Sequence, residues 1–590
     1  MIKLIKYFKW WYYPLIVAII GLVYIQVEFD LKLVDYMRVI VELVGRANST
    51  GEAQTSLILQ NGLEMLGYSL ISIASLIVVY FISARIGANF VKDLRKRLFD
   101  KIDSFSLEEI NQFSTSSLIT RSTNDITQVQ MVTIVMLRLA ITAPITAIRA
   151  IMKITDINLS LTLPVIAGVV GVVLMISVIF IFVTPKFKVL QDLNDSLNLV
   201  TRENLTGLRV VRAHNAEGYE HSKFEKANKK LTGVNLFVNR GMQLMMPGMQ
   251  LVMNGVSLAI TWIGASLIFD GALGANPYEG IGIQSQFSIY SFQILMSFMM
   301  LTMLFIMVPR GAVSGRRIME VLSTEPKIKD PVNPKTINKD DRITLEFDNV
   351  CFKYPGASEC VLEHISFEVK AGETVAFVGS TGSGKSTIIN LIPRFFDTTN
   401  GEIKINGINI KDVKQKDLLD LIGYVPQQGL LFSGTIRSNL SLGKKDATEE
   451  EILEVLEIAQ ARNFVNRLED GIYASVSQGG KNFSGGQRQR LSIARAIVKN
   501  PKIYIFDDSF SALDYNTDRA LRSALKEKTK SAINLIVAQR IGTILNADKI
   551  VVLDKGRAVG IGTHKELLEN NKVYQEMAYS QLSKEELQNA

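Results

Sequence analysis

The sequence predicts a fold of two parts, an all-α transmembrane domain of six helices followed by a soluble α/β domain. The 590 residues are 47% hydrophobic, and every apolar stretch near the roughly 20 residues that a membrane helix needs lies before residue 310. After residue 341, short apolar strands alternate with helices and glycine-containing turns, as expected of an α/β domain. We therefore expect a transmembrane domain at 1–310, a linker at 311–340 and an α/β domain at 341–590.

Six apolar stretches are expected to cross the membrane. They lie near residues 11–28, 63–88, 131–155, 158–183, 243–269 and 285–308. The start of the chain, "MIKLIKYFKWWYY", predicts an interfacial helix with Trp10 and Trp11 at the membrane surface. A cleaved signal peptide is the alternative, but bulky aromatic residues stand where small residues would mark a cleavage site.

The distribution of Lys and Arg predicts the orientation in the membrane. The long loops 89–129 and 184–240 carry six and ten of these residues, whereas the connections 30–62 and 270–284 carry three and none. Because basic loops stay on the cytoplasmic side, we expect both long loops, both termini and the α/β domain in the cytoplasm, and the chain in the cell membrane.

The basic balance does not indicate nucleic-acid binding. The net charge of +8 comes largely from loops that flank the membrane, which favours contact with anionic membrane lipid. Cys351 and Cys360 both lie in the predicted cytoplasmic part, so we expect neither a structural disulfide nor a metal cluster from them.

The α/β part contains a phosphate-binding loop. "GSTGSGKST" comprises Gly379, Ser380, Thr381, Gly382, Ser383, Gly384, Lys385, Ser386 and Thr387. It follows an apolar strand and precedes a helix-compatible run, which is the context that this motif requires. Its glycines allow backbone N–H groups to surround phosphate oxygens, Lys385 reaches the outer phosphates, and the Ser386 hydroxyl is expected to bind Mg²⁺. ATP and Mg²⁺ are therefore the predicted cofactors.

Two further motifs belong to the same site. "KIYIFDDSFSALD" is an apolar strand that ends at Asp507, where a carboxylate is expected beside Mg²⁺. Just ahead of it, Ser484, Gly485, Gly486 and Gln487 form "SGGQ" at a predicted helix start. Free backbone N–H groups at such a start bind phosphate.

On these motifs the chain resembles an ATP-binding-cassette (ABC) exporter of the half-transporter type, with the membrane domain first. By this resemblance Tyr354, in "CFKYPG", stacks on adenine, and Gln427, in "YVPQQG", contacts Mg²⁺. The resemblance also implies that two nucleotide domains dimerise head to tail, so that the "SGGQ" of one chain completes the ATP site of the other. The segments Phe113–Arg121 and Asn204–Glu220 resemble the loops that couple the two domains.

The chain departs from the family pattern at two positions of its own ATP site. Asp508 stands where the family has its catalytic glutamate, and Gln539 stands where the family has a histidine. The first is one methylene shorter, and the second carries no charge near neutral pH. With "SGGQ" intact, this pattern predicts a degenerate site and a heterodimer whose second half-transporter subunit supplies the missing glutamate and histidine. A homodimer or a regulatory ABC protein with slow ATP turnover is the alternative.

Two membrane helices suggest the class of cargo. Ten of the 19 methionines lie on the fifth and sixth stretches: Met242, Met245, Met246, Met249, Met253, Met296, Met299, Met300, Met303 and Met307. Methionine lines surfaces that accept varied partners, although interhelical packing would use it equally well. Phe287, Phe292, Phe298 and Phe305 lie nearby. We therefore expect a multidrug-type exporter of amphipathic or lipophilic compounds, with a dedicated peptide or lipid exporter as the alternative.

Overall fold

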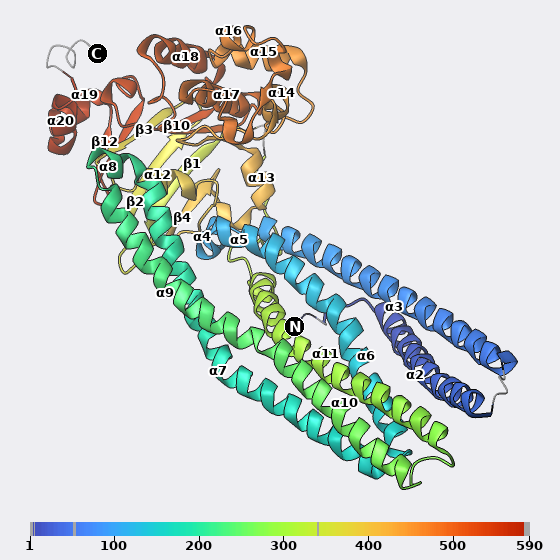
Figure 1. Ribbon diagram of the computed structural model, residues 1–590. Helices are drawn as coiled ribbons and strands as arrows, with labels where there is room; N and C mark the ends of the chain where they lie inside the picture. Colours follow the sequence, from blue (N-terminus) through green and yellow to red (C-terminus); the bar gives the residue numbers. More distant parts are fainter. Residues whose placement is uncertain (1–3, 5, 51–54, 339–340, 583–590) are drawn as a thin grey trace. The chain divides into compact units, whose positions relative to one another are not determined.

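The computed structural model describes residues 4, 6–50, 55–338 and 341–582 (Figure 1). It divides into a helical unit, formed by residues up to Asp103 and by Ser116–Thr324, and an α/β unit, formed by Ser104–Thr115 and the residues from Glu325 onward. Each unit is described by itself.

The helical unit consists of long apolar helices. They are α2 (Tyr12–Thr50), α3 (Thr55–Asp103), α6 (Ile126–Thr155), α7 (Leu159–Thr206), α9 (Glu217–Gln243), α10 (Met245–Phe269) and α11 (Pro277–Ser323). With α9 and α10 taken as one segment, the described residues contain six helices long and apolar enough to span a membrane. The prediction of six membrane helices is confirmed, although most of these helices extend well beyond their apolar stretches.

The predicted N-terminal interfacial helix includes residues 1–3 and 5, which lie outside the described residues. Residues 6–11 form turns and irregular backbone. They are attached to α3, because Lys9 Nζ lies 2.6 Å from Asp93 Oδ2 and the Phe8 ring packs against Phe90.

Small residues allow neighbouring helices to approach closely. A Cβ atom added at Gly87 of α3 would lie 2.4 Å from Ile134 Cγ1 of α6, and one added at Gly168 of α7 would lie 2.4 Å from Val256 Cγ2 of α10. Close approach of this kind supplies much of the packing between membrane helices, where the lipid is as apolar as the side chains.

Ion pairs connect α2 to α6. Arg149 donates to Glu28 Oε2 through Nη2 (2.7 Å) and Nε (3.0 Å). Lys153 Nζ lies 2.7 Å from Asp35 Oδ2. The charge of Arg149 is therefore balanced within the helical unit.

Helix α11 joins the same network through uncharged groups. Its Gln286 Nε2 donates to Asp35 Oδ1 (2.6 Å), and the Tyr290 hydroxyl donates to the same oxygen. Arg138, the other arginine of α6, is placed differently: its guanidinium lies over the Tyr80 ring of α3, 3.2 Å from the ring centre. Charged groups at membrane depth are costly unless they are paired, and these contacts meet that requirement.

The two long basic loops contain short helices, α4 (Leu107–Phe113) and α5 (Thr115–Thr120) in the first loop and α8 (Leu208–Ala213) in the second. Helix α8 buries no residue within the described chain, and its Val210 side chain is 62% exposed. An apolar helix surface of this kind is free to contact another chain or domain.

The α/β unit is built on two main sheets (Figure 1). An antiparallel sheet has the order β2-β1-β4-β5, and a larger sheet has the order β12-β11-β3-β10-β9-β6, parallel except for β12. The strands are β1 (Thr344–Phe352), β2 (Leu362–Lys370), β3 (Thr374–Gly379), β4 (Asn400–Ile405), β5 (Ile408–Asn409), β6 (Ile422–Val425), β7 (Gly434–Thr435), β8 (Ser475–Val476), β9 (Ile503–Asp507), β10 (Ile533–Val537), β11 (Lys549–Asp554) and β12 (Arg557–Gly562).

The helices of the α/β unit are α12 (Lys385–Leu391), α13 (Gln415–Asp420), α14 (Ile436–Leu440), α15 (Glu449–Ile458), α16 (Arg462–Val465), α17 (Gly485–Val498), α18 (Tyr515–Lys528), α19 (His564–Asn570) and α20 (Lys572–Tyr579). All five residues of β9 are buried, as expected for a central parallel strand.

The arrangement of the strands determines where the site lies. Neighbouring strands β3, β10 and β9 run parallel, so that their carboxyl ends meet at one edge of the sheet. Ligands of open α/β sheets bind at this edge. The phosphate loop follows β3, Asp507 ends β9, and Gln539 follows β10 by two residues.

Candidate ATP site and membrane pocket

The phosphate loop has the backbone that its glycines permit. Gly382 and Gly384 have φ angles of 84° and 98°, a left-handed conformation that other residues rarely adopt. A Cβ atom at Gly379 would lie 2.2 Å from the carbonyl oxygen of Leu553. Only glycine fits this position, because backbone atoms of β11 lie directly against it.

The side chains of the loop are suited to hold phosphate. Lys385 Nζ lies inside the loop and donates to the carbonyl oxygens of Gly379 and Ser380, both at 2.8 Å. The buried hydroxyl oxygen of Ser383 has no hydrogen-bond partner among the described residues. An ammonium group and an unsatisfied hydroxyl within one cradle fit the triphosphate of ATP.

Two of the predicted magnesium ligands lie together. The Ser386 hydroxyl donates to Asp507 Oδ1 at 3.2 Å. Both supply oxygen, the atom that Mg²⁺ prefers. Ser386 lies at the start of α12 directly after the phosphate loop, and Asp507 ends β9. The third predicted ligand, Gln427, is engaged elsewhere, since its amide contacts Asp508.

Asp508 is held by two amides. Its Oδ2 accepts hydrogen bonds from Gln539 Nε2 (2.8 Å) and from Gln427 Nε2 (3.4 Å). Its φ angle of 45° is left-handed, a conformation that aspartate tolerates better than most residues. The two positions that depart from the family pattern are thus in direct contact.

Burial shifts the pKa values of three charged groups in the site. It raises the pKa of Asp507, and the Asp508 charge raises it further, while the Ser386 hydrogen bond lowers it. Burial also raises the pKa of Asp508, partly offset by its hydrogen bonds to Gln427 and Ser511. The pKa of Lys385 is lowered by burial, against the effect of the two carboxylates. Burial therefore disfavours the charged form of all three groups.

Tyr354 lies beside the phosphate-loop helix. Its hydroxyl is 3.1 Å from Thr387 Oγ1, and its ring packs edge-on against Phe352 and Phe396. The ring is only partly buried. One of its surfaces can therefore accept a planar base, the role that the sequence predicts for it.

The "SGGQ" segment has the geometry of a capped helix start. Ser484 precedes α17, where its hydroxyl accepts from the Gln487 N–H, and the Gln487 side chain accepts from the Ser484 N–H. This reciprocal capping box fixes the first turn. No heavy atom lies within 4 Å of a Cβ built at Gly485, so the first backbone N–H groups are accessible to a phosphate group.

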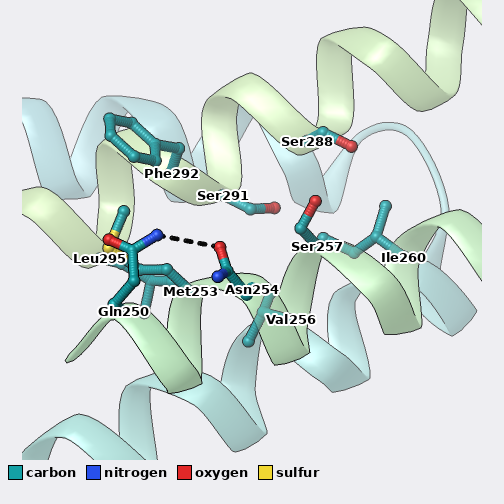
Figure 2. A pocket seen from close by; sticks show the side chains of 10 residues that line it. All are labelled: Gln250, Met253, Asn254, Val256, Ser257, Ile260, Ser288, Ser291, Phe292 and Leu295. Carbon is teal, nitrogen blue, oxygen red and sulfur yellow. Dashed lines mark hydrogen bonds between the residues drawn. The ribbon is translucent and has the colours of Figure 1, made fainter. Parts of the chain in front are cut away.

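The helical unit contains a pocket between α10 and α11, with a volume of about 160 Å³ (Figure 2). Its lining combines amide, hydroxyl and apolar groups: Gln250, Met253, Asn254, Val256, Ser257, Ile260, Ser288, Ser291, Phe292 and Leu295. None of these side chains carries a formal charge. Gln250 Nε2 donates to Asn254 Oδ1 at 3.0 Å, so the two amides lie side by side at the pocket wall.

The pocket differs from the methionine surface expected from the sequence. Of the ten methionines, Met253 is the one that lines it, while Met246 is 66% exposed and Met249 is buried. The helix is interrupted at Leu244, which separates Met242 from the other four. The polar residues were missed, although two amides four residues apart in an apolar helix were a readable signal.

Comparisons with known proteins agree with this geometry. Residues 37–308 match the ABC transporter transmembrane region, and residues 362–511 match the ABC transporter family. An uncharacterised ABC transporter ATP-binding protein of Mycobacterium tuberculosis is 38% identical over 537 residues, which cover 90% of this chain and 91% of that protein. The ATP-dependent lipid A-core flippase of Haemophilus influenzae is 32% identical over 554 residues, covering 89% and 91%.

Among solved structures, a bacterial Atm1-family ABC exporter with ATP bound has the same fold. It superposes with a TM-score of 0.78 over 96% of this chain and 98% of that chain, at 24% sequence identity.

Proposed function

Because this chain belongs to the ABC transporter family and is an ATP-driven exporter integral to a membrane, we propose that it is one half of a heterodimeric exporter. Its own ATP site holds nucleotide and hydrolyses it slowly. Its "SGGQ" segment completes the hydrolytic site of a different half-transporter subunit, which supplies the glutamate and histidine that are absent here.

The contact between Asp508 and Gln539 carries this proposal. A general base must reach the water whose proton it accepts, and such a base contributes about 10²- to 10⁴-fold in rate. Asp508 is one methylene shorter than glutamate, and its Oδ2 already accepts hydrogen bonds from Gln539 and Gln427. Gln539 offers an uncharged amide in place of an imidazole. Both changes favour retention of ATP over hydrolysis at this site.

The accessible "SGGQ" supports the second half of the proposal. Its capping box and the open space at Gly485 leave it ready to bind the γ-phosphate at the partner's site. In a homodimer both ATP sites would be slow, so the intact "SGGQ" segment would complete no rapidly hydrolysing site.

The proposed cargo is an amphipathic or lipophilic compound of the multidrug type, and the α10–α11 pocket is its candidate contact. Phe292, Leu295 and Met253 offer apolar contact, while Ser257, Ser291 and the two amides offer hydrogen bonds. Lipid export is a second candidate, favoured by the similarity to the lipid A-core flippase. The basic loops support an orientation with the ATP-binding unit in the cytoplasm.

The decisive test is ATP hydrolysis by this chain alone and together with a candidate partner half-transporter, each purified in lipid nanodiscs. We expect near silence from this chain alone and robust turnover from the pair. Rapid hydrolysis by this chain alone would exclude the proposal.

Matched variants of this chain then test the asymmetry within the active pair. Gly485→Glu places a carboxylate where the partner's phosphate should bind, and a carboxylate at a helix N-terminus is compatible with folding. It should abolish turnover, whereas Asp508→Asn should retain most of it. Equal loss in both variants would indicate two equivalent hydrolytic sites. Asp508→Glu with Gln539→His should increase hydrolysis at this chain's own site.

Transport assays with the active pair reconstituted in lipid vesicles distinguish the two cargo classes. Efflux of lipophilic dyes supports the multidrug class, whereas movement of labelled lipid between leaflets without dye efflux supports lipid export.

A further inference from the structure

Gln581 follows helix α20 and belongs to none of the ATP-site motifs. Its side-chain Oε1 accepts a hydrogen bond from the Ile541 N–H at 2.8 Å, and its Nε2 donates to the carbonyl oxygen of Gln539 at 3.0 Å. These two backbone groups lie on either side of Arg540. One amide side chain, 40 residues away in sequence, therefore holds both ends of the turn that leaves Gln539.

The local structure explains why this turn needs an outside partner. Ile541 is the first residue of the short 3-10 helix η5 (Ile541–Thr543), and a first helical N–H has no partner within its own helix. The Ile541 side chain is fully buried, and the residue before it, Arg540, provides no side-chain cap. Without Gln581, a strong backbone donor beside the core would lose its hydrogen bond.

Gln581 is itself held in place. Its backbone N–H donates to the Ala578 carbonyl at 3.1 Å and closes the last turn of α20. Its neighbour Leu582 packs against the apolar cluster that α19 and α20 form with the sheet. The amide is thus presented from a fixed backbone.

The turn leads directly to the ATP site. On its other side, the chain is fixed by the sheet, because the Ala538 N–H donates to the Phe377 carbonyl of β3. Between these two anchors, Gln539 Nε2 donates to Asp508 Oδ2 at 2.8 Å. A shift of the backbone at Gln539 would therefore move its amide away from Asp508.

We propose that Gln581 is a positioning residue, which holds the turn after β10 so that Gln539 stays against Asp508 and bound ATP is retained. The inference rests on the proposed role of this site in holding ATP. It concerns ATP retention at this chain's own site and does not depend on a partner subunit.

The test measures dissociation of radiolabelled AMP-PNP with Mg²⁺ from the full chain in lipid nanodiscs. Gln581→Ala removes both hydrogen bonds and should increase the dissociation rate about 2- to 10-fold, since one hydrogen bond is worth about 0.5–1.5 kcal/mol. Gln581→Glu keeps the acceptor for Ile541 and removes the donor to Gln539, so it should also increase the rate.

The matched control is Gln575→Ala. Gln575 Nε2 donates to the Leu568 and Glu569 carbonyls (2.7 and 3.2 Å), so it joins α19 to α20 without contacting the turn. Its dissociation rate should equal that of the unmodified chain. An equal increase in both variants would assign Gln581 a merely structural role, and no increase in the Gln581 variants would overturn the proposal.

A double-mutant cycle tests whether Gln581 acts through Gln539. In a Gln539→Ala background, Gln581→Ala should cause little further change. Additive effects would refute the positioning role. Because AMP-PNP is not hydrolysed, the cycle remains interpretable even if the turnover assay shows that this site hydrolyses ATP rapidly, so the two proposals fail separately.

Discussion

Removal of the Asp35 carboxylate should destabilise the helical unit far more than removal of its ion-pair partner. Asp35→Ala leaves Lys153 without its carboxylate and removes one hydrogen bond each from Gln286 and Tyr290. The Tyr290 hydroxyl keeps its bond to the Leu31 carbonyl at 3.2 Å, and the Gln286 amide keeps its longer contact with the Tyr290 hydroxyl at 3.5 Å. Lys153→Met removes the charge pair alone, because Asp35 keeps both of its neutral donors. The two substitutions therefore separate the ion pair from the hydrogen bonds around it.

The magnitudes follow from the exposure of the groups. The side chains of Asp35 and Lys153 are 34% and 32% exposed. We therefore assign the ion pair a contribution of about 1 kcal/mol to the free energy of unfolding, near the upper end of the range for surface ion pairs. Loss of each hydrogen bond to Asp35 adds about 0.5–1.5 kcal/mol. We expect a loss of about 2–4 kcal/mol for Asp35→Ala and about 1 kcal/mol for Lys153→Met. Asp35→Asn with Lys153→Met should lie close to the unmodified protein, because the asparagine oxygen still accepts from both donors.

Tryptophan fluorescence during unfolding by SDS measures these values for the helical unit specifically. All three tryptophans of the chain, Trp10, Trp11 and Trp262, belong to this unit. Lys32→Met on the same helix is the control, because Lys32 contacts the Phe29 and Tyr68 rings. Equal losses for Asp35→Ala and Lys153→Met would refute the reasoning, since the ion pair would then account for the whole effect.

Three further predictions concern the ATP site and the helix packing. Burial raises the pKa of Asp508, so its ionised form lowers the stability of the folded chain once the pH exceeds the ordinary aspartate range. Asp508→Asn should therefore raise the melting temperature at pH 7.5. The difference between the two melting temperatures should shrink as the pH is lowered and Asp508 becomes protonated. Tyr354→Ala should weaken ATP binding about tenfold in equilibrium titration, while Tyr354→Phe keeps the aromatic surface and most of the affinity. Gly87→Val should cost about 1–3 kcal/mol because Ile134 occupies the space, while Gly67→Val on the same helix, where a Cβ meets no atom within 4 Å, should be neutral in SDS unfolding.

The parts of the fold that local patterns encode were predictable from the sequence. Six apolar stretches predicted six membrane helices, because length and hydropathy alone decide whether a segment can span a bilayer. The phosphate loop and the end of β9 were also readable, and the contact between Ser386 and Asp507 follows from parallel strands that end at one edge.

The remaining features depend on how distant segments pack. The partner of Arg149, Glu28, lies 121 residues earlier, and the sequence alone does not determine the rotation of one helix against another. Gln581 belongs to no sequence motif. Its role depends on where α20 ends relative to the turn after β10, which the fold determines. The sequence predicted that Asp508 and Gln539 share a site, whereas their direct hydrogen bond required side-chain geometry.

The separation of Glu28 from Arg149 has a consequence for synthesis of the protein. The carboxylate emerges from the ribosome 121 residues before its partner, which corresponds to about 6–24 s at the usual rate of translation. Glu28 is the last residue of the first apolar stretch, where a charge costs less to insert than at the helix centre. During this interval the first helix carries Glu28 without the arginine that pairs with it in the folded helical unit.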